Sequence, residues 1–240
     1  MEEGTTDPAD DSQRAGDHDS IGIIGGTGPA GIALATRLAL VGRTVVIGSR
    51  DDDRARAAAS AILAEDGRSS WRLTGGTNTD AARCADVVLA VKADHTVAVA
   101  EAYRTQLDGR IVVSMASRLR RVARGFAAEL PSGSSIAAAV QAVLPESRVV
   151  AALQHLPARQ LGDVDSDIEA DIMVCGDDAA AVAKIRATFA ALTNGRIIDA
   201  GPLANAVAIE TLTAVLVTLN VRERAAYSIK LVDESATTDR

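Results

Sequence analysis

The chain has 240 residues, a formal net charge of −7, 48% apolar residues and only 2% aromatic residues. This length fits one large α/β domain with a small appendage, or two small domains, around a core of aliphatic side chains. The negative charge argues against nucleic-acid and anionic-membrane partners, and the shortage of aromatic rings for base stacking strengthens the first exclusion.

The first nineteen residues, "MEEGTTDPADDSQRAGDHD", are acidic and contain no apolar stretch. They lack the apolar centre of a signal peptide, so we expect a disordered acidic arm over 1–19. No apolar run approaches the roughly 20 residues of a membrane span, so no membrane partner is expected. The two distant cysteines, Cys84 and Cys175, predict neither a disulfide framework nor a metal site and favour a cytoplasmic location.

The first half of the chain alternates between strand-like and helix-like stretches. An apolar run over 20–24 precedes a glycine cluster and predicts a buried parallel strand, and the Ala- and Leu-rich stretch 29–40 predicts a helix with Pro29 in its first turn. Five further strands are expected at 44–47, 71–75, 86–91, 110–115 and 148–153, and a helix at 53–65. This alternation predicts an α/β fold, a Rossmann-type doubly wound and mostly parallel sheet with a small C-terminal domain.

The spacing of the elements changes after Gln154. The later elements are predicted as strands at 171–175, 195–201 and 226–232 and as helices at 179–192 and 203–220. The polar stretch 158–166 between the two halves suggests a boundary. We therefore expect the acidic arm over 1–19, a nucleotide-binding domain over 20–157 and a small domain over 158–240 that completes a second pocket.

Three glycines follow the first predicted strand in the pattern G-x-G-x-x-G: Gly26, Gly28 and Gly31. In a strand–turn–helix context this pattern indicates dinucleotide binding. The first glycine permits the turn, the second lets the backbone approach a pyrophosphate, and the third lets the helix pack on the sheet. The free N–H groups of the helix N-terminus then face the phosphates.

The second strand ends in Ser49 and Arg50, where an NAD-binding protein usually carries an acid. A guanidinium matches the geometry of a phosphate, and Arg54 adds a second positive charge one helical turn later. The site therefore predicts NADP rather than NAD. The three acids at 51–53 weigh against this interpretation, unless they cap the next helix.

Several motifs together resemble the NADPH-dependent reductases of the deazaflavin coenzyme F420. They are "IGIIGGTGPAG", "VVIGSR", "VCGDD", "DAGPLANA" and "ETLTAVLVTLN", and they extend the resemblance from residue 20 to about residue 232. The resemblance implies an NADP-binding Rossmann domain, a small C-terminal part, reversible hydride transfer between NADPH and F420, and a homodimer. Its NADP positions, together with the glycines of the motif, are Gly26, Thr27, Gly28, Pro29, Ala30, Gly31, Ser49, Arg50 and Arg54.

The resemblance also suggests where the second ligand binds. Val91 matches a backbone position near the nicotinamide, the segment "AALQHLPA" matches a wall of the deazaflavin pocket, and Tyr227 matches the C-terminal approach to it. The residues expected to contact the second ligand are Gln154, His155 and Pro157 within that segment and Leu203 outside it. The chain departs from the family pattern at Lys92 and Ala93, where many members carry proline and an aromatic residue, and at Gln154, where histidine is usual.

No catalytic triad or metal site is expected, because hydride transfer mainly requires alignment of two rings and exclusion of water. His155 either lines the pocket or is purely structural. If the protein instead reduces a small carbonyl or imine, Lys92 is a candidate proton donor. A non-catalytic NADP-binding module is a third alternative. The arginines at 118, 120, 121 and 124 form either a solvated face or a receptor for the anionic tail of the deazaflavin.

Overall fold

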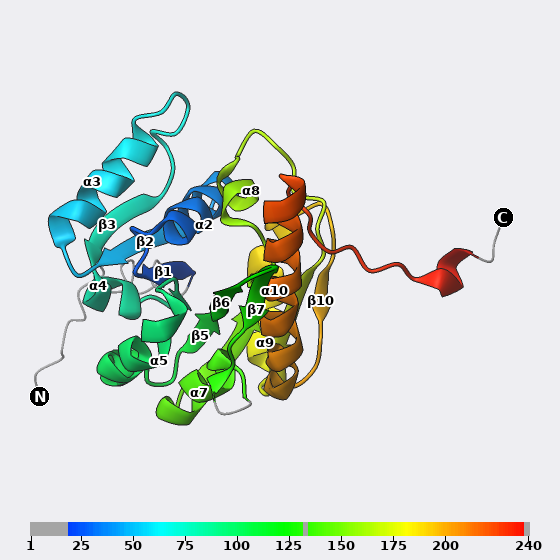
Figure 1. Cartoon of the computed structure of the whole chain (residues 1–240). Helices are drawn as coiled ribbons and strands as arrows, with labels where there is room; N and C mark the ends of the chain where they lie inside the picture. The colour runs from blue at the N-terminus through cyan, green and yellow to red at the C-terminus, as the bar shows by residue number, and fades with distance from the viewer. Residues whose placement is uncertain (1–18, 132–133, 238–240) are drawn as a thin grey trace, which may run out of the picture.

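The computed structural model describes residues 19–131 and 134–237, so the expected acidic arm lies outside the described residues except for Asp19. An eight-stranded sheet in the order β10-β9-β8-β5-β4-β1-β2-β3 forms the centre, with helices on both faces (Figure 1). This architecture confirms the predicted Rossmann-type fold. The strands of the sheet are β1 (Ser20–Ile24), β2 (Thr44–Ser49), β3 (Leu73–Thr77), β4 (Asp86–Leu89), β5 (Ile111–Ser114), β8 (Arg148–Ala152), β9 (Ile172–Gly176) and β10 (Ile197–Asp199).

Nine helices accompany the strands in the described part of the chain, and the sequence pattern predicted a range for four of them, at 29–40, 53–65, 179–192 and 203–220. The first predicted helix, 29–40, has the predicted bounds. The helices are α2 (Pro29–Leu40), α3 (Asp52–Leu63), α4 (Asn78–Ala82), α5 (Ala93–Ala102), α6 (Arg104–Leu107), α7 (Ile136–Val143), α8 (Ala158–Gly162), α9 (Ala179–Phe189) and α10 (Ala206–Glu223). Short 3₁₀ turns occupy Ala190–Leu192, Leu203–Asn205 and Glu234–Thr237.

The last two strands of the sheet run in the opposite direction to the other six. β9 pairs antiparallel with β8, and β10 pairs parallel with β9. The connection between β8 and β9 carries only the five-residue α8, which is much shorter than the usual crossover helix of a parallel pair. As a consequence, the strands β9 and β10 end on the side of the sheet where β1, β4, β5 and β8 begin.

The sheet continues across the expected domain boundary at 157/158, because β8 and β9 are neighbours within it. The polar segment 158–166 is also bound to the first half of the chain. The buried guanidinium of Arg37 on α2 donates hydrogen bonds to the carbonyl oxygens of Gln160 (3.2 Å), Leu161 (3.1 Å) and Ser166 (3.2 Å). Residues 158–237 therefore add two strands to the same sheet. The helices of this part are mainly α9 and α10.

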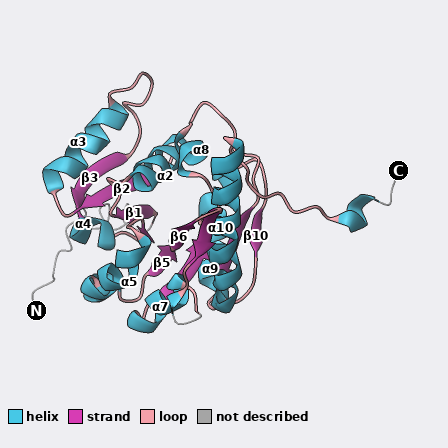
Figure 2. Cartoon of the chain, in the orientation of Figure 1, coloured by secondary structure: helices cyan, strands magenta, loops and turns pink. Residues whose placement is uncertain are grey.

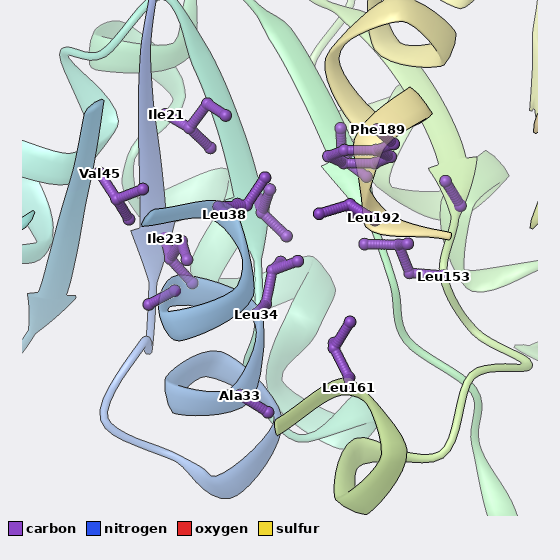
Figure 3. Close-up of a cluster of buried hydrophobic side chains, with 14 of the residues drawn as sticks. Ile21, Ile23, Ala33, Leu34, Leu38, Val45, Leu153, Leu161, Phe189 and Leu192 are labelled. Carbon is purple, nitrogen blue, oxygen red and sulfur yellow. The ribbon is translucent and has the colours of Figure 1, made fainter. Parts of the chain in front are cut away.

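Two clusters of buried aliphatic side chains form the core, one on each face of the sheet. Figure 3 shows part of the first cluster, in which Leu34 and Leu38 of α2 lie between β1, which carries Ile21 and Ile23, and the chain around Leu161. The central strands β1, β4 and β5 are completely buried. This burial explains their mainly apolar sequences, which are typical of parallel strands covered on both faces.

Three features differ from the sequence-based expectations. A hairpin of β6 (Leu119–Val122) and β7 (Gly125–Ala128), not predicted, lies beside α10 (Figure 2). The expected strand at 226–232 is wrong, because this segment is extended but pairs with no sheet. The expectation about apolar length is also wrong: Leu203–Glu223 is long and apolar enough to span a membrane by length and composition. A third of that apolar window is buried against the rest of the protein.

Candidate active site

The glycine loop after β1 is held by contacts from the start of α4 and from the segment after β4. Gly25 adopts a left-handed φ of 73°, and its N–H donates to Oδ1 of the buried Asn78, 3.1 Å away. A Cβ atom on Gly25 would lie only 2.4 Å from Cγ1 of Val91. Val91 therefore lies directly against the loop. Sequence reasoning missed Asn78, which follows the weakest predicted strand.

The three motif glycines have different steric surroundings. A Cβ on Gly26 would lie 2.8 Å from the Ile23 carbonyl oxygen, and one on Gly31 would lie 2.6 Å from the Cα of Gly26. Both glycines are thus required by packing within the chain. A Cβ on Gly28 would meet nothing closer than 3.6 Å, and Gly28 has an ordinary φ of −77°. Neither packing nor backbone conformation requires a glycine at position 28, so the open space there is available to a ligand.

The N-terminus of α2 has no side-chain cap and no acid in its first turn. Four other helices, α3, α4, α7 and α9, begin at residues whose side chains accept a backbone N–H: Asp51, Thr77, Ser135 and Asp178. The uncapped N–H groups and the positive end of the helix dipole at α2 together form an anion-binding arrangement next to Gly28.

The acids after β2 are used within α3. Asp51 caps the helix by accepting from the Arg54 N–H (3.1 Å), and Asp52 and Asp53 form ion pairs with Arg56. Within residues 19–131 and 134–237, Arg50 and Arg54 form no ion pair with a carboxylate, and both side chains are exposed. The acids thus do not neutralise these two arginines, which remain available for a phosphate at the end of β2.

A second polar cluster lies where β5 and β8 end. The Gln154 Nε2 donates to the Ser114 carbonyl oxygen (3.1 Å), and the Thr213 hydroxyl of α10 donates to the Gln154 carbonyl oxygen (3.2 Å). Ser117 in turn donates to Thr213 (3.2 Å). The Ser114 Oγ and the Gln154 Oε1 are buried and have no hydrogen-bond partner among the described residues. Buried polar atoms rarely remain unpaired, so these two mark a place for a polar ligand or for water.

The backbone is strained at the start of this cluster. Leu153, the residue after β8, adopts a left-handed φ of 72° although it has a bulky side chain. This conformation costs about 1–2 kcal/mol for a residue other than glycine, and such strain concentrates at functional sites. The turn directs the segment from Gln154 to Pro157 across the carboxyl edge of the sheet.

His155, in the segment after β8, lies buried against the residue that precedes β9. Its side chain is buried, and its Nε2 lies 2.9 Å from the carbonyl oxygen of Asp171, where it serves as the donor. Burial lowers the pKa of His155 below its usual range, so the ring is neutral. The Asp171 carboxylate accepts from Arg196 and from the Leu231 N–H (2.8 Å), and its pKa falls to about 2, mainly because of Arg196. His155 therefore ties β8 to this network.

Glu210 on α10 is a buried carboxyl group that sequence reasoning did not single out. Its two oxygens accept the N–H groups of Ile136 (2.8 Å) and Ala137 (3.1 Å) at the start of α7. Burial raises its pKa to about 7. Glu210 thus fixes α10 to the start of α7. This contact lies one helical turn from Thr213, so it helps to hold the part of α10 that contacts Gln154.

Glu210→Gln should flatten the dependence of stability on pH. The raised pKa means that the folded state holds the proton more tightly, so the free energy of unfolding should fall as pH rises from about 4.5 to about 7 and then level off. The full shift corresponds to about 3 kcal/mol. Urea denaturation measures the free energy of unfolding at pH 5 and at pH 7.5. The decrease between these two pH values should be smaller in Glu210→Gln than in wild type, by an amount on the order of the full shift. The exposed control Glu101→Gln should match wild type, and an identical change in all three proteins would contradict the assignment.

The remaining expected site residues are scattered. Leu203 is 3% exposed, and its N–H donates to Asp177 beyond β9, so it lies at the opposite edge of the sheet from Gln154. This corrects the expectation that Leu203 walls the second pocket; the unforeseen reversal of β9 and β10 explains the difference. Tyr227 is half exposed beyond the end of α10, and Lys92 is exposed at the start of α5. Pro157 begins α8.

Similarity to characterised proteins covers most of the chain. Residues 20–118 match a family model described as "NADP oxidoreductase coenzyme F420-dependent". The F420-dependent NADP reductase of Methanothermobacter thermautotrophicus is 35% identical over 210 residues, which cover 85% of this chain and 90% of that protein. The chain belongs to the F420-dependent NADP reductase family. The reductase of Methanocaldococcus jannaschii is 35% identical over 211 residues, with 85% and 94% covered.

The fold of this chain also agrees with that of a solved structure. A protein of Arthrobacter sp. FB24, described as a candidate F420-dependent NADP reductase, superposes with a TM-score of 0.72 at 26% identity and covers 90% of this chain and 99% of that one. The match spans almost the whole of the Arthrobacter protein. The Rossmann-type sheet and the C-terminal helical part are therefore both features of the F420-dependent NADP reductase fold.

Proposed function

We propose that the protein transfers hydride reversibly between NADPH and the deazaflavin coenzyme F420. The single observation that carries this proposal is identity of about a third, over nearly the full length, to two F420-dependent NADP reductases. The two ring systems supply the carbon centres between which hydride moves when both are bound. The task of the protein is then to hold the rings in register and to exclude water.

The glycine loop and the end of β2 are the proposed NADP site. Gly28 and the uncapped start of α2 would receive the pyrophosphate, with Thr27, Pro29 and Ala30 at the same turn. The unpaired Arg50 and Arg54 would hold the 2′-phosphate, and the Ser49 hydroxyl, which accepts from the Asp51 N–H (3.1 Å), lies beside them. Val91 would lie near the nicotinamide because it contacts the loop at Gly25.

The Gln154 cluster is the proposed site of the deazaflavin ring. The unpartnered Ser114 Oγ and Gln154 Oε1 fit a ring with a polar edge that both donates and accepts hydrogen bonds. Both residues lie at the carboxyl edge of the sheet, where ligands of doubly wound folds collect. Thr213 and Ser117 hold Gln154 in position through their hydroxyl groups.

Spectroscopy with the purified protein tests the proposal. NADPH should bleach the absorbance of oxidised F420 at a rate proportional to enzyme concentration, and NADP should restore it from the reduced form. If NADPH is oxidised only in the presence of an organic carbonyl or imine, the protein is a reductase of that substrate class and Lys92 becomes the proton-donor candidate. Nucleotide binding without any turnover would instead indicate a non-catalytic module.

We also propose that the protein is a cytoplasmic homodimer that associates through the outer face of α10. Val215 and Leu219, one turn apart on this face, are 51% and 37% exposed. Adjacent exposed aliphatic side chains on a long helix favour association with another surface. Cys84 and Cys175 form no disulfide with each other, which fits a reducing compartment.

Val215→Lys should convert the dimer to a monomer, because a charged side chain would have to be buried at the interface without a partner. Size-exclusion chromatography with light scattering measures the mass directly. The matched control is Ala61→Lys on the exposed face of α3, which should remain dimeric. A monomeric wild type, or a dimeric Val215→Lys, would exclude this interface.

A further inference from the structure

A hollow of about 570 Å³ lies between the turn of the β6–β7 hairpin and the last turn of α10. Its lining consists of residues 121–126 together with Val221 and Arg222. Three guanidinium groups, those of Arg121, Arg124 and Arg222, line it, and no carboxylate does. This is an unusual concentration of positive charge in a protein with a net charge of −7.

The arginines of the hairpin fall into two groups. At its base, Arg118 pairs with Asp94 (2.8 Å) and Glu129 (3.2 Å), and Arg120 lies 3.7 Å from Glu129. These two arginines belong to an ordinary solvated ion-pair network. The other group surrounds the hollow.

Among the described residues, Arg121, Arg124 and Arg222 form no ion pair with a carboxylate. Arg121 instead lies over the ring of Phe126, its cross-strand partner, 5.8 Å from the ring centroid. Like charges that share one hollow repel each other, and an anion between them would remove that repulsion. Planar guanidinium groups also match phosphate and carboxylate geometry.

The hollow and the Gln154 cluster are connected by α10 and the hairpin. Thr213 of α10 bonds to the Gln154 carbonyl oxygen, and Thr218 accepts the Phe126 N–H (2.9 Å), which fixes the hairpin along the helix. Arg222 follows Thr213 by nine residues, which corresponds to about 13 Å along a helix axis. A ligand with its ring at Gln154 and an anionic tail lying along α10 would therefore reach the hollow.

We propose that the hollow of Arg121, Arg124 and Arg222 binds the anionic tail of the second ligand, a chain of phosphate and carboxylate groups. The inference rests on the proposed function, because the tail belongs to the deazaflavin whose ring is assigned to Gln154. It separates two tasks: the Gln154 cluster recognises the ring, and the hollow provides affinity through charge.

The test compares intact F420 with a deazaflavin that retains the ring and the ribitol but lacks the phosphate and glutamates. Arg124→Gln, Arg222→Gln and the double variant are measured by calorimetric titration and by steady-state kinetics. Each substitution should raise the Kd and KM for intact F420 about tenfold, as expected for loss of one charge-assisted contact. The kcat, the KM for NADPH and both constants for the tail-less compound should stay within twofold. The wild-type Kd for intact F420 should also rise with salt concentration.

Arg120→Gln is the matched control, since Arg120 lies on the same hairpin but next to Glu129, and it should behave as wild type. Unchanged binding of intact F420 in the double variant would overturn the inference, as would equal weakening of both compounds. The inference would also be overturned if the wild type reduces both deazaflavins and binds them with equal Kd. That result would leave the proposed function in place. A wild type that reduces neither would overturn both.

Discussion

Gly28→Ala should nearly abolish nucleotide binding while leaving the stability of the protein close to that of wild type. A methyl group at position 28 would meet no atom of the chain closer than 3.6 Å, and the backbone there suits any L-residue. Replacement of glycine by alanine reduces the freedom of the unfolded chain and favours the folded state by about 0.4–1 kcal/mol. Alanine is a poorer N-cap than glycine at the start of α2, which offsets this gain by a similar amount. The same methyl group would occupy the space through which the pyrophosphate approaches the backbone.

Gly31→Ala is the matched control, because its methyl group would lie 2.6 Å from the Cα of Gly26. Here the fold itself should lose stability, by about 1–3 kcal/mol. Thermal melting and calorimetric titration with NADPH measure the two effects separately. If Gly28→Ala binds NADPH as tightly as wild type, the pyrophosphate does not lie on this loop.

Arg50→Ala should raise the KM for NADPH by roughly ten- to a hundredfold, which corresponds to about 1.5–3 kcal/mol for the loss of a charge-assisted contact. The KM for NADH should change little, because NADH has no 2′-phosphate. The physical reason is the absence of a competing acid: Asp51 caps α3, and Asp52 and Asp53 face Arg56. Arg50 is therefore free to bind the phosphate.

Arg56→Ala provides the matched control, because Arg56 lies on the same helix but is paired with acids of that helix. It should leave the ratio of the two KM values as in wild type. Steady-state kinetics with both nucleotides give this ratio directly. Equal effects of Arg50→Ala on NADPH and NADH would remove Arg50 from the 2′-phosphate site.

Local patterns in the sequence were sufficient to predict the six sheet strands of the nucleotide-binding half and its first two helices. The strand at 20–24 and the helix at 29–40 agree with the structure residue for residue, because continuous apolar runs, Pro29 and Gly42 are all local signals. The acids at 51–53 could be interpreted in two ways from the sequence. The structure resolves the ambiguity through one cap and two ion pairs.

The parts that sequence reasoning missed depend on contacts between distant residues. The reversal of β9 has no local signature, because a buried strand has the same apolar pattern in either direction. That reversal moved Leu203 to the far edge of the sheet. Asn78, Ser114 and Thr213 could not be recognised either, since each acts through a partner that lies 40 or more residues away in the chain.

Transfer of label from deuterated NADPH tests the central claim most directly. The account holds that the glycine loop and the Gln154 cluster place the two rings against each other, so that hydride passes between carbon atoms without exchange with water. NADPH carrying deuterium at the transferred position of nicotinamide C4 should yield reduced F420 with one deuterium on the ring, detected by mass spectrometry. Reduced F420 that contains only solvent hydrogen, or the absence of any reduced F420, would contradict the account.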